Sequence, residues 1–115
     1  MTISGSDLIR IERLRQVTSE AYKPAGDVGH ADALVSAATA YSINSLFLLV
    51  PGEADGYSAD TPLAPWPWAA EFWKPTGDPV RDLVKAGALI AAALDALIAE
   101  HEAATVIAPA SGLKR

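Results

Sequence analysis

The longest helical pattern in the chain is DPVRDLVKAGALIAAALDALIAEHEA, residues 78–103. Asp78 followed by Pro79 is typical of a helix start, because the aspartate accepts hydrogen bonds from free backbone N–H groups and proline presets the backbone angle of the first turn. Apolar residues then recur at helical spacing on one side, and alanines together with Leu89 form a second apolar edge. A helix that is apolar on two sides is central to its fold or lies in a subunit interface. We therefore expect a central or dimer-forming helix over residues 79–103.

A second helix is expected near the N-terminus, over residues 7–21, after the cap-forming residues Ser6 and Asp7. Its apolar residues fall on one face, which we expect to pack on the core: Leu8, Ile11 and Leu14. A polar stripe steps by four residues along the other side: Glu12, Gln16 and Glu20. A stripe of this kind is usually solvated, and carboxylates that point into a site are the alternative.

The third helix is expected over residues 31–48, after a turn rich in glycine and proline. Leu34, Ala38 and Tyr41 mark its broad apolar stripe, and the run over residues 46–50 is apolar all round, which predicts a buried helix end. These patterns predict an all-α fold of three main helices.

Closely spaced prolines make residues 51–78 a long loop. Its later part holds aromatic side chains with too much apolar area to stay hydrated, so we expect it to pack over the helices: Trp66, Trp68, Phe72 and Trp73. Residues 1–104 are expected to form a single helical domain that includes this loop. Residues 105–115 are expected to form a loose C-terminal tail.

Composition excludes several classes of function. The chain has no cysteine, which rules out disulfides, thiolate zinc sites and a cysteine nucleophile. Its formal net charge of −5 argues against nucleic acid as a partner, because binding to a phosphate backbone requires clustered Lys and Arg. No pattern of a signal peptide or a membrane span is recognised, so we expect a cytoplasmic location and no membrane partner.

No catalytic motif and no cofactor motif is recognised, and the sequence favours binding over catalysis. His30 lies near Asp27 and Asp32, a combination that can hold a divalent metal. The two aspartates flank a glycine-rich turn, however, where Asp ordinarily serves turn and cap hydrogen bonds. We therefore predict no catalytic residues, no cofactor and no metal site.

The three tryptophans are the most informative candidates for a binding site, because flat aromatic faces are the usual platform for a base, a sugar or an organic cation. Trp66, Trp68 and Trp73 lie within eight residues of one another. Basic residues that we expect to meet phosphate groups complete the candidate site: Arg13, Lys74, Arg81 and Lys85. The alternative is that prolines and tryptophans only staple the loop across the helices.

Three motifs, PWPW at residues 65–68, WKP at 73–75 and DLVKAGALI at 82–90, occur in this order. With them the chain resembles a family of small, mostly uncharacterised phage and prophage proteins. It departs from the family pattern in the acidic turn over residues 26–34 and in the mostly apolar segment 91–99. The resemblance implies an accessory factor that acts in the host cell on host machinery or host defence.

These observations lead to three functional hypotheses. The first is non-covalent binding of a small nucleotide-like ligand, as in a sponge for a host defence signal. The alternative is an inhibitor that binds a host protein directly, and the third is a MazG-like nucleotide pyrophosphohydrolase. Because the helix over residues 79–103 has two apolar edges, we also expect a homodimer.

Overall fold

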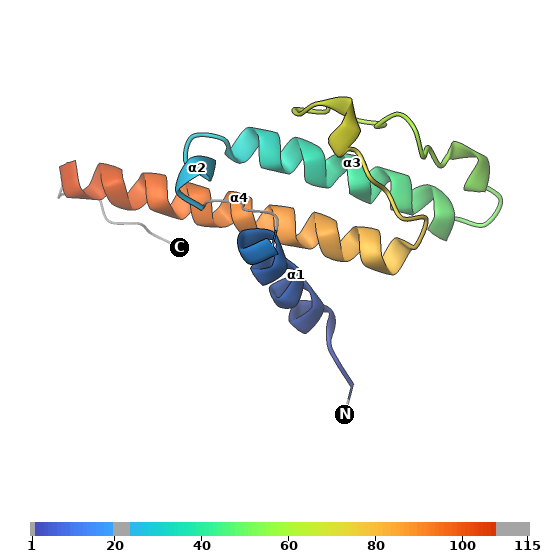
Figure 1. The fold of residues 1–115 in the computed structure, drawn as a ribbon, viewed down its shortest axis with the longest axis horizontal. Helices are drawn as coiled ribbons and strands as arrows, with labels where there is room; N and C mark the ends of the chain where they lie inside the picture. The colour runs from blue at the N-terminus through green and yellow to red at the C-terminus, as the bar shows by residue number, and fades with distance from the viewer. Residues whose placement is uncertain (1, 20–23, 108–115) are drawn as a thin grey trace.

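The computed structural model describes residues 2–19 and 24–107 and is all-α, as expected (Figure 1). Four α-helices occur in the described residues: α1 (Gly5–Ser19), α2 (Pro24–Asp27), α3 (Ala31–Leu49) and α4 (Pro79–Ile107). Two 3₁₀ turns, η1 (Ala54–Gly56) and η2 (Ala70–Phe72), lie in the long loop. The single-turn helix α2 was not predicted, and α4 continues into the expected tail, of which residues 108–115 lie outside the described residues.

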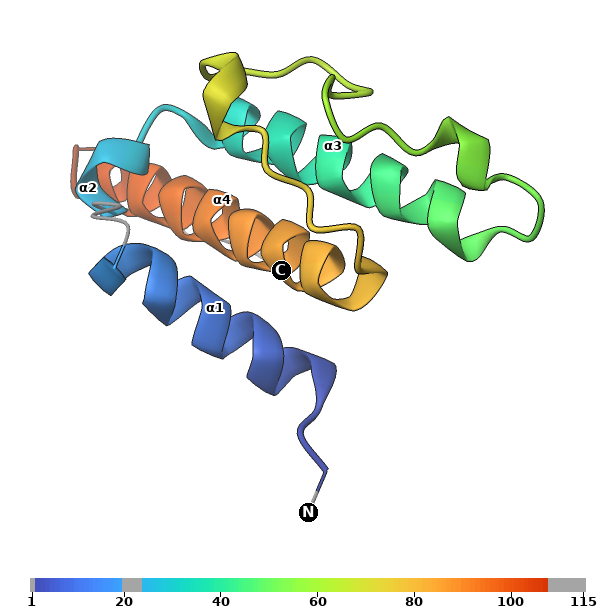
Figure 2. The same cartoon turned by 45° about the vertical axis from the view of Figure 1, so that its right-hand side comes forward.

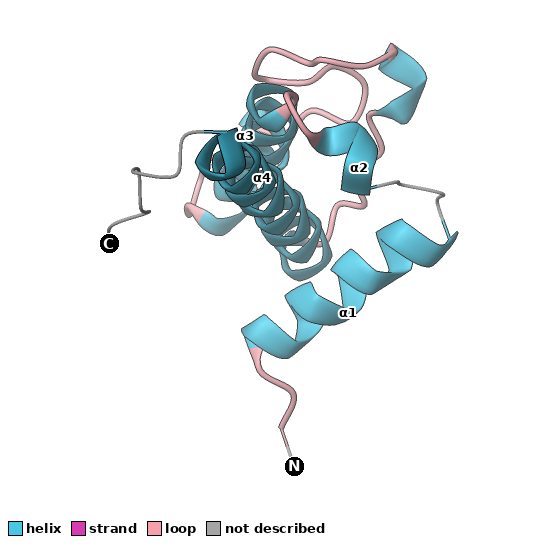
Figure 3. Cartoon of the chain, turned by 90° about the vertical axis from the view of Figure 1, so that its left-hand side faces the viewer, coloured by secondary structure: helices cyan, strands magenta, loops and turns pink. Residues whose placement is uncertain are grey.

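Helices α3 and α4 lie side by side and antiparallel at the centre of the molecule (Figures 1 and 2). Helix α1 crosses α4 obliquely on the side away from α3, and the loop between α3 and α4 runs over the outer side of α3. Figure 3 shows the helices in another view, with α4 between α1 and α3. The expected central position of α4 is therefore confirmed.

The contact between α3 and α4 is built largely from alanine. The buried alanines come from both helices: Ala37, Ala38 and Ala40 of α3, and Ala86, Ala88, Ala92, Ala93 and Ala96 of α4. Small side chains let two helix axes approach closely. The larger residues Leu34, Tyr41 and Leu89 of the helices and Trp73 of the loop complete the buried cluster. The core thus depends on close helix packing more than on large side chains.

The predicted stripe of α3 is buried at Leu34, Ala38 and Tyr41, each at most 3% exposed. Leu46 and Leu49 are each 56% exposed and Val50 is 41% exposed, so the expectation of a buried apolar helix end is wrong. Positions outside the predicted stripe, such as Asn44, are buried as well. The physical reason is that α3 presents its small residues to α4, which leaves several bulky residues outside the contact.

Helix α1 packs with a different face from the one predicted. Ile11 and Leu14 are 54% and 63% exposed, so the predicted apolar core face is wrong, and Gln16 is only 3% exposed, so the polar stripe is not solvated there. Glu20, the third residue of that stripe, lies outside the described residues. Ile9 makes the apolar contact with α4, at Gly87. If Gly87 carried a side chain, its Cβ atom would lie only 2.5 Å from the Cδ1 atom of Ile9. The glycine therefore lets α1 approach α4 closely at this point.

Local hydrogen bonds fix the start of α4. The backbone N–H of Val80 donates to Oδ1 of Asp78 at 3.0 Å, which confirms the predicted cap. One turn later, the buried carboxylate of Asp82 accepts bonds from the backbone N–H and the hydroxyl of Thr76, at 3.0 and 2.8 Å to Oδ1. These bonds hold the end of the long loop against the first turn of α4.

Among the described residues, α3 alone is long and apolar enough to cross a membrane by length and composition. The core helix of a soluble protein and a signal sequence near the N-terminus pass the same criterion. The contact with α4 buries Leu34 and three alanines of α3, whereas Leu46 and Leu49 are exposed.

Because Leu89 is 3% exposed within the α3–α4 contact, we expect Leu89→Ala to lower the free energy of unfolding by about 2–5 kcal/mol. The matched control is Leu49→Ala on the outer side of α3, which should change it by less than about 0.5 kcal/mol. Urea unfolding followed by circular dichroism measures both. Equal losses in the two variants would contradict the described core.

Candidate ligand-binding site

The tryptophans form one cluster with Tyr41 of α3. The ring centroid of Trp73 lies 4.7 Å from that of Tyr41, and the Trp66 centroid lies 5.9 Å from Tyr41 and 5.3 Å from Trp73. Trp73 is 5% exposed, and the indole N–H of Trp66 donates to the carbonyl of Ala69 at 3.1 Å. The rings therefore contact one another and fasten the loop onto α3, as the stapling alternative describes.

Trp68 connects the cluster to a small pocket at the start of α3. Its ring centroid lies 5.4 Å from that of Trp66. The pocket has a volume of about 250 Å³ and is lined by Gly26, Asp27, His30, Ala33, Leu34 and Trp68. Trp68 is thus the tryptophan of the cluster whose ring meets this pocket, next to His30.

A larger pocket of about 520 Å³ opens between α1 and the first turns of α4. Its apolar wall consists of Leu8, Ile11, Val80 and Val84, and its polar lining consists of Glu12, Arg15, Thr76, Arg81 and Lys85. Three cationic side chains from two helices therefore meet at one opening, with Glu12 as the one carboxylate in the lining. We call this the α1–α4 pocket.

An ion pair orders one side of the α1–α4 pocket. The guanidinium of Arg15 donates two hydrogen bonds to the carboxylate of Glu12, at 2.8 and 2.7 Å, and the amide of Gln16 donates a third at 3.3 Å. The bond from Arg15 lowers the pKa of Glu12, and the charge of Lys85 adds to this effect. Glu12 therefore stays ionised and holds Arg15 in place beside the pocket.

Lys85 joins the pocket to the aromatic cluster. Its Nζ atom lies 5.0 Å from the centroid of the Tyr41 ring and 3.4 Å from the carbonyl oxygen of Lys74. The backbone N–H of Lys74 in turn donates to the hydroxyl of Tyr41 at 3.2 Å. The loop that carries the tryptophans therefore helps to position Lys85 through Tyr41 and the Lys74 carbonyl.

Arg13 belongs to a different cluster. Its Nη2 atom lies 3.8 Å from a carboxylate oxygen of Asp27 and 3.7 Å from one of Asp95, so it links α1 to α2 and α4. Arg13 and Asp27 are each only 14% exposed. Burial raises the pKa of Asp27, although the charge of Arg13 acts in the opposite direction.

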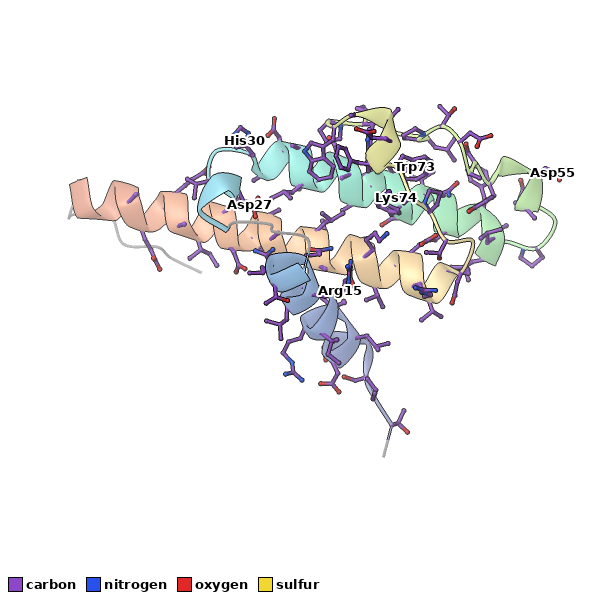
Figure 4. All side chains as sticks on the ribbon, in the orientation of Figure 1. Arg15, Asp27, His30, Asp55, Trp73 and Lys74 are labelled. Carbon is purple, nitrogen blue, oxygen red and sulfur yellow. The ribbon has the colours of Figure 1, made fainter. Side chains whose placement is uncertain are left out.

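The structure thus divides the predicted site. Arg81 and Lys85 meet in the α1–α4 pocket, the tryptophans lie on the other side of the helix pair, and Arg13 lies at the junction with α2. Figure 4 shows Arg15 on the α1 side and Trp73 with Lys74 over α3. Sequence reasoning missed Arg15, which lies four residues after Ile11 and lines the same pocket.

The alternative metal site of Asp27, His30 and Asp32 is not assembled. The described part of the chain contains no group of three or more His, Asp or Glu side chains that could hold a metal ion. Asp32 instead accepts a hydrogen bond from the backbone N–H of Ala33 at 2.9 Å. Its role is the ordinary one of an aspartate in the first turn of a helix.

Comparisons of the chain with protein-family models, with curated proteins and with solved structures find no match. The functional assignment below is therefore argued from the geometry of the described residues.

Because burial raises the pKa of Asp27, the ionised carboxylate lowers the stability of the folded protein at neutral pH. We expect Asp27→Asn to raise the melting temperature at neutral pH, since Arg13 keeps its contact with Asp95. The gain should shrink as the pH falls toward the ordinary carboxyl pKa of 3.8, where the wild-type side chain also becomes protonated.

Thermal unfolding across this pH range tests the prediction. The matched control is Asp55→Asn, because Asp55 is exposed. A lower melting temperature of Asp27→Asn at neutral pH would show that the ion pair outweighs the cost of burial.

Proposed function

We propose that the protein binds a small, phosphate-bearing, nucleotide-like ligand non-covalently in the α1–α4 pocket. The observation that carries the proposal is the meeting of Arg15, Arg81 and Lys85 at one pocket of about 520 Å³. Guanidinium groups bind phosphate through paired hydrogen bonds, and an ammonium group adds a point charge. Arg15 is already oriented by Glu12, so little ordering of this side chain is required when a ligand binds.

The size and the lining of the pocket fit this class of ligand. Pockets for small molecules have volumes of about 300–1,000 Å³ and are mostly apolar, with a few polar groups that fix orientation. The aliphatic wall of Leu8, Ile11, Val80 and Val84 provides a surface for a flat base or a sugar, and the cationic side chains provide the phosphate end. In this proposal the tryptophans act indirectly, because they position Lys85.

The net charge of −5 does not oppose such a site, because charges beyond about 10 Å are largely screened at moderate salt. What matters is the local balance of three cations against one carboxylate in the pocket lining. Hydrolysis by a MazG-like mechanism would require several carboxylates to converge on a metal, whereas the carboxylate of Glu12 is bonded to Arg15. Binding without turnover is therefore the better fit.

Taken with the resemblance to small phage proteins, the proposal extends to a sponge that removes a nucleotide signal of host defence in the host cytoplasm. One observation favours the second candidate, an inhibitor that binds a host protein. Phe72 of the turn η2 is 57% exposed, and an exposed aromatic side chain is a typical anchor of a protein interface.

Arg81→Ala should weaken ligand binding about tenfold or more, because a hydrogen bond to a charged group contributes about 1.5–3 kcal/mol. Isothermal titration calorimetry measures this with a panel of nucleoside monophosphates, diphosphates and triphosphates and of cyclic dinucleotides. The matched control is Lys74→Ala, an exposed cation outside the pocket lining, which should leave the affinity unchanged.

Three outcomes separate the hypotheses. Recovery of an unaltered ligand after the protein is denatured supports a sponge, and recovery of a cleaved product supports the hydrolase. If no member of the panel binds, the ligand proposal is wrong and the inhibitor becomes the better candidate. Binding that Lys74→Ala weakens as strongly as Arg81→Ala would show that the ligand lies elsewhere.

A further inference from the structure

Helix α4 carries an apolar stripe that stays largely exposed, although α1 meets it at Gly87. Leu83 and Ile90 are each 40% exposed, Leu94 is 54% exposed and Leu97 is 49% exposed. These positions, together with Gly87, are separated alternately by four and three residues. This is the spacing of a heptad seam, by which one helix packs lengthwise against another. We call Leu83, Ile90, Leu94 and Leu97 the α4 seam.

A second exposed apolar edge lies on α1. Because α1 turns its polar side inward, Ile11 and Leu14 remain 54% and 63% exposed. Ile9 of the same helix packs on Gly87, which occupies the seam position between Leu83 and Ile90. The α1 edge, formed by Ile11 and Leu14, therefore belongs to the helix that meets α4 within the seam.

We propose that a second copy of this chain packs on the α4 seam and the α1 edge and forms a twofold-symmetric homodimer. Six side chains of these two surfaces expose together roughly 500 Å², against about 800 Å² per partner in an interface of standard size. Ile98, which is 38% exposed beside the seam, adds further area. A heptad seam is self-complementary, because the leucines of one copy fill the spaces between those of the other.

The charge distribution on α4 favours a second copy as the occupant. Two chains with a net charge of −5 repel each other, so a contact between them is favoured where no like charges face one another. At 3.6 residues per turn, Arg81, Lys85 and Asp95 lie on the opposite half of the helix from the seam. The positions that flank the seam are uncharged: Ala86, Ala91, Ala93 and Ile98.

The mass of the full chain in solution tests this proposal, and it requires no ligand, so its outcome is independent of the proposed function. Sedimentation equilibrium at micromolar concentration should give twice the chain mass of 12.0 kDa. Leu94→Glu should give a single-chain mass with unchanged helix content, because Leu94 is 54% exposed in one copy. The control Leu46→Glu, at a residue 56% exposed on α3, should leave the dimer intact.

A wild-type protein of 12.0 kDa at all concentrations would overturn the proposal and leave the seam to a different protein. A dimer that survives Leu94→Glu, or one that Leu46→Glu dissociates, would overturn it as well, because the contact would lie elsewhere. If Leu94→Glu lowers the helix content, the variant no longer tests the contact, and the test rests on the wild-type protein. Its melting temperature must rise with protein concentration, and a constant value overturns the proposal.

Discussion

The close contact of alanines between α3 and α4 is the constraint on which the rest of the structure depends. Two helices joined through Ala37, Ala40, Ala86 and Ala92 approach each other closely, but these small side chains contribute little buried area each. The remaining stability has to come from elements added at the sides of the pair. The aromatic loop adds area on α3, and α1 adds area on α4.

That arrangement explains why the molecule has polar residues inside and leucines outside. The alanine-rich contact leaves room for few long side chains between α3 and α4, so bulky residues such as Leu46 and Leu94 stay at the periphery. Helix α1 then meets α4 at Gly87 and Asp95, where Ile9 and Arg13 find partners. The α1–α4 pocket lies beside this contact and borders Ile11, which also belongs to the proposed dimer surface.

Helix positions were predictable because their signals are local. The cap at Asp78 and the repeated spacing of apolar residues depend on neighbours in the sequence. The buried faces were not predictable in the same way, since a helix such as α1 has an apolar and a polar side and the sequence does not tell which one meets α4. The candidate site shows the same limit. Arg81 and Lys85 share a helix and line one pocket, whereas the positions of Arg15 and Arg13 depend on how α1 is rotated.

All three tryptophans of the chain lie between residues 66 and 73, in the segment packed on Tyr41. Intrinsic fluorescence of this protein therefore reports on the seating of the loop and not on the helices directly. The far-ultraviolet dichroism signal comes instead from α1, α3 and α4. Unfolding curves recorded by these two probes coincide only if the loop and the helix pair unfold as one cooperative unit. The two signals therefore distinguish unfolding of the loop from unfolding of the helices without an added fluorescent label.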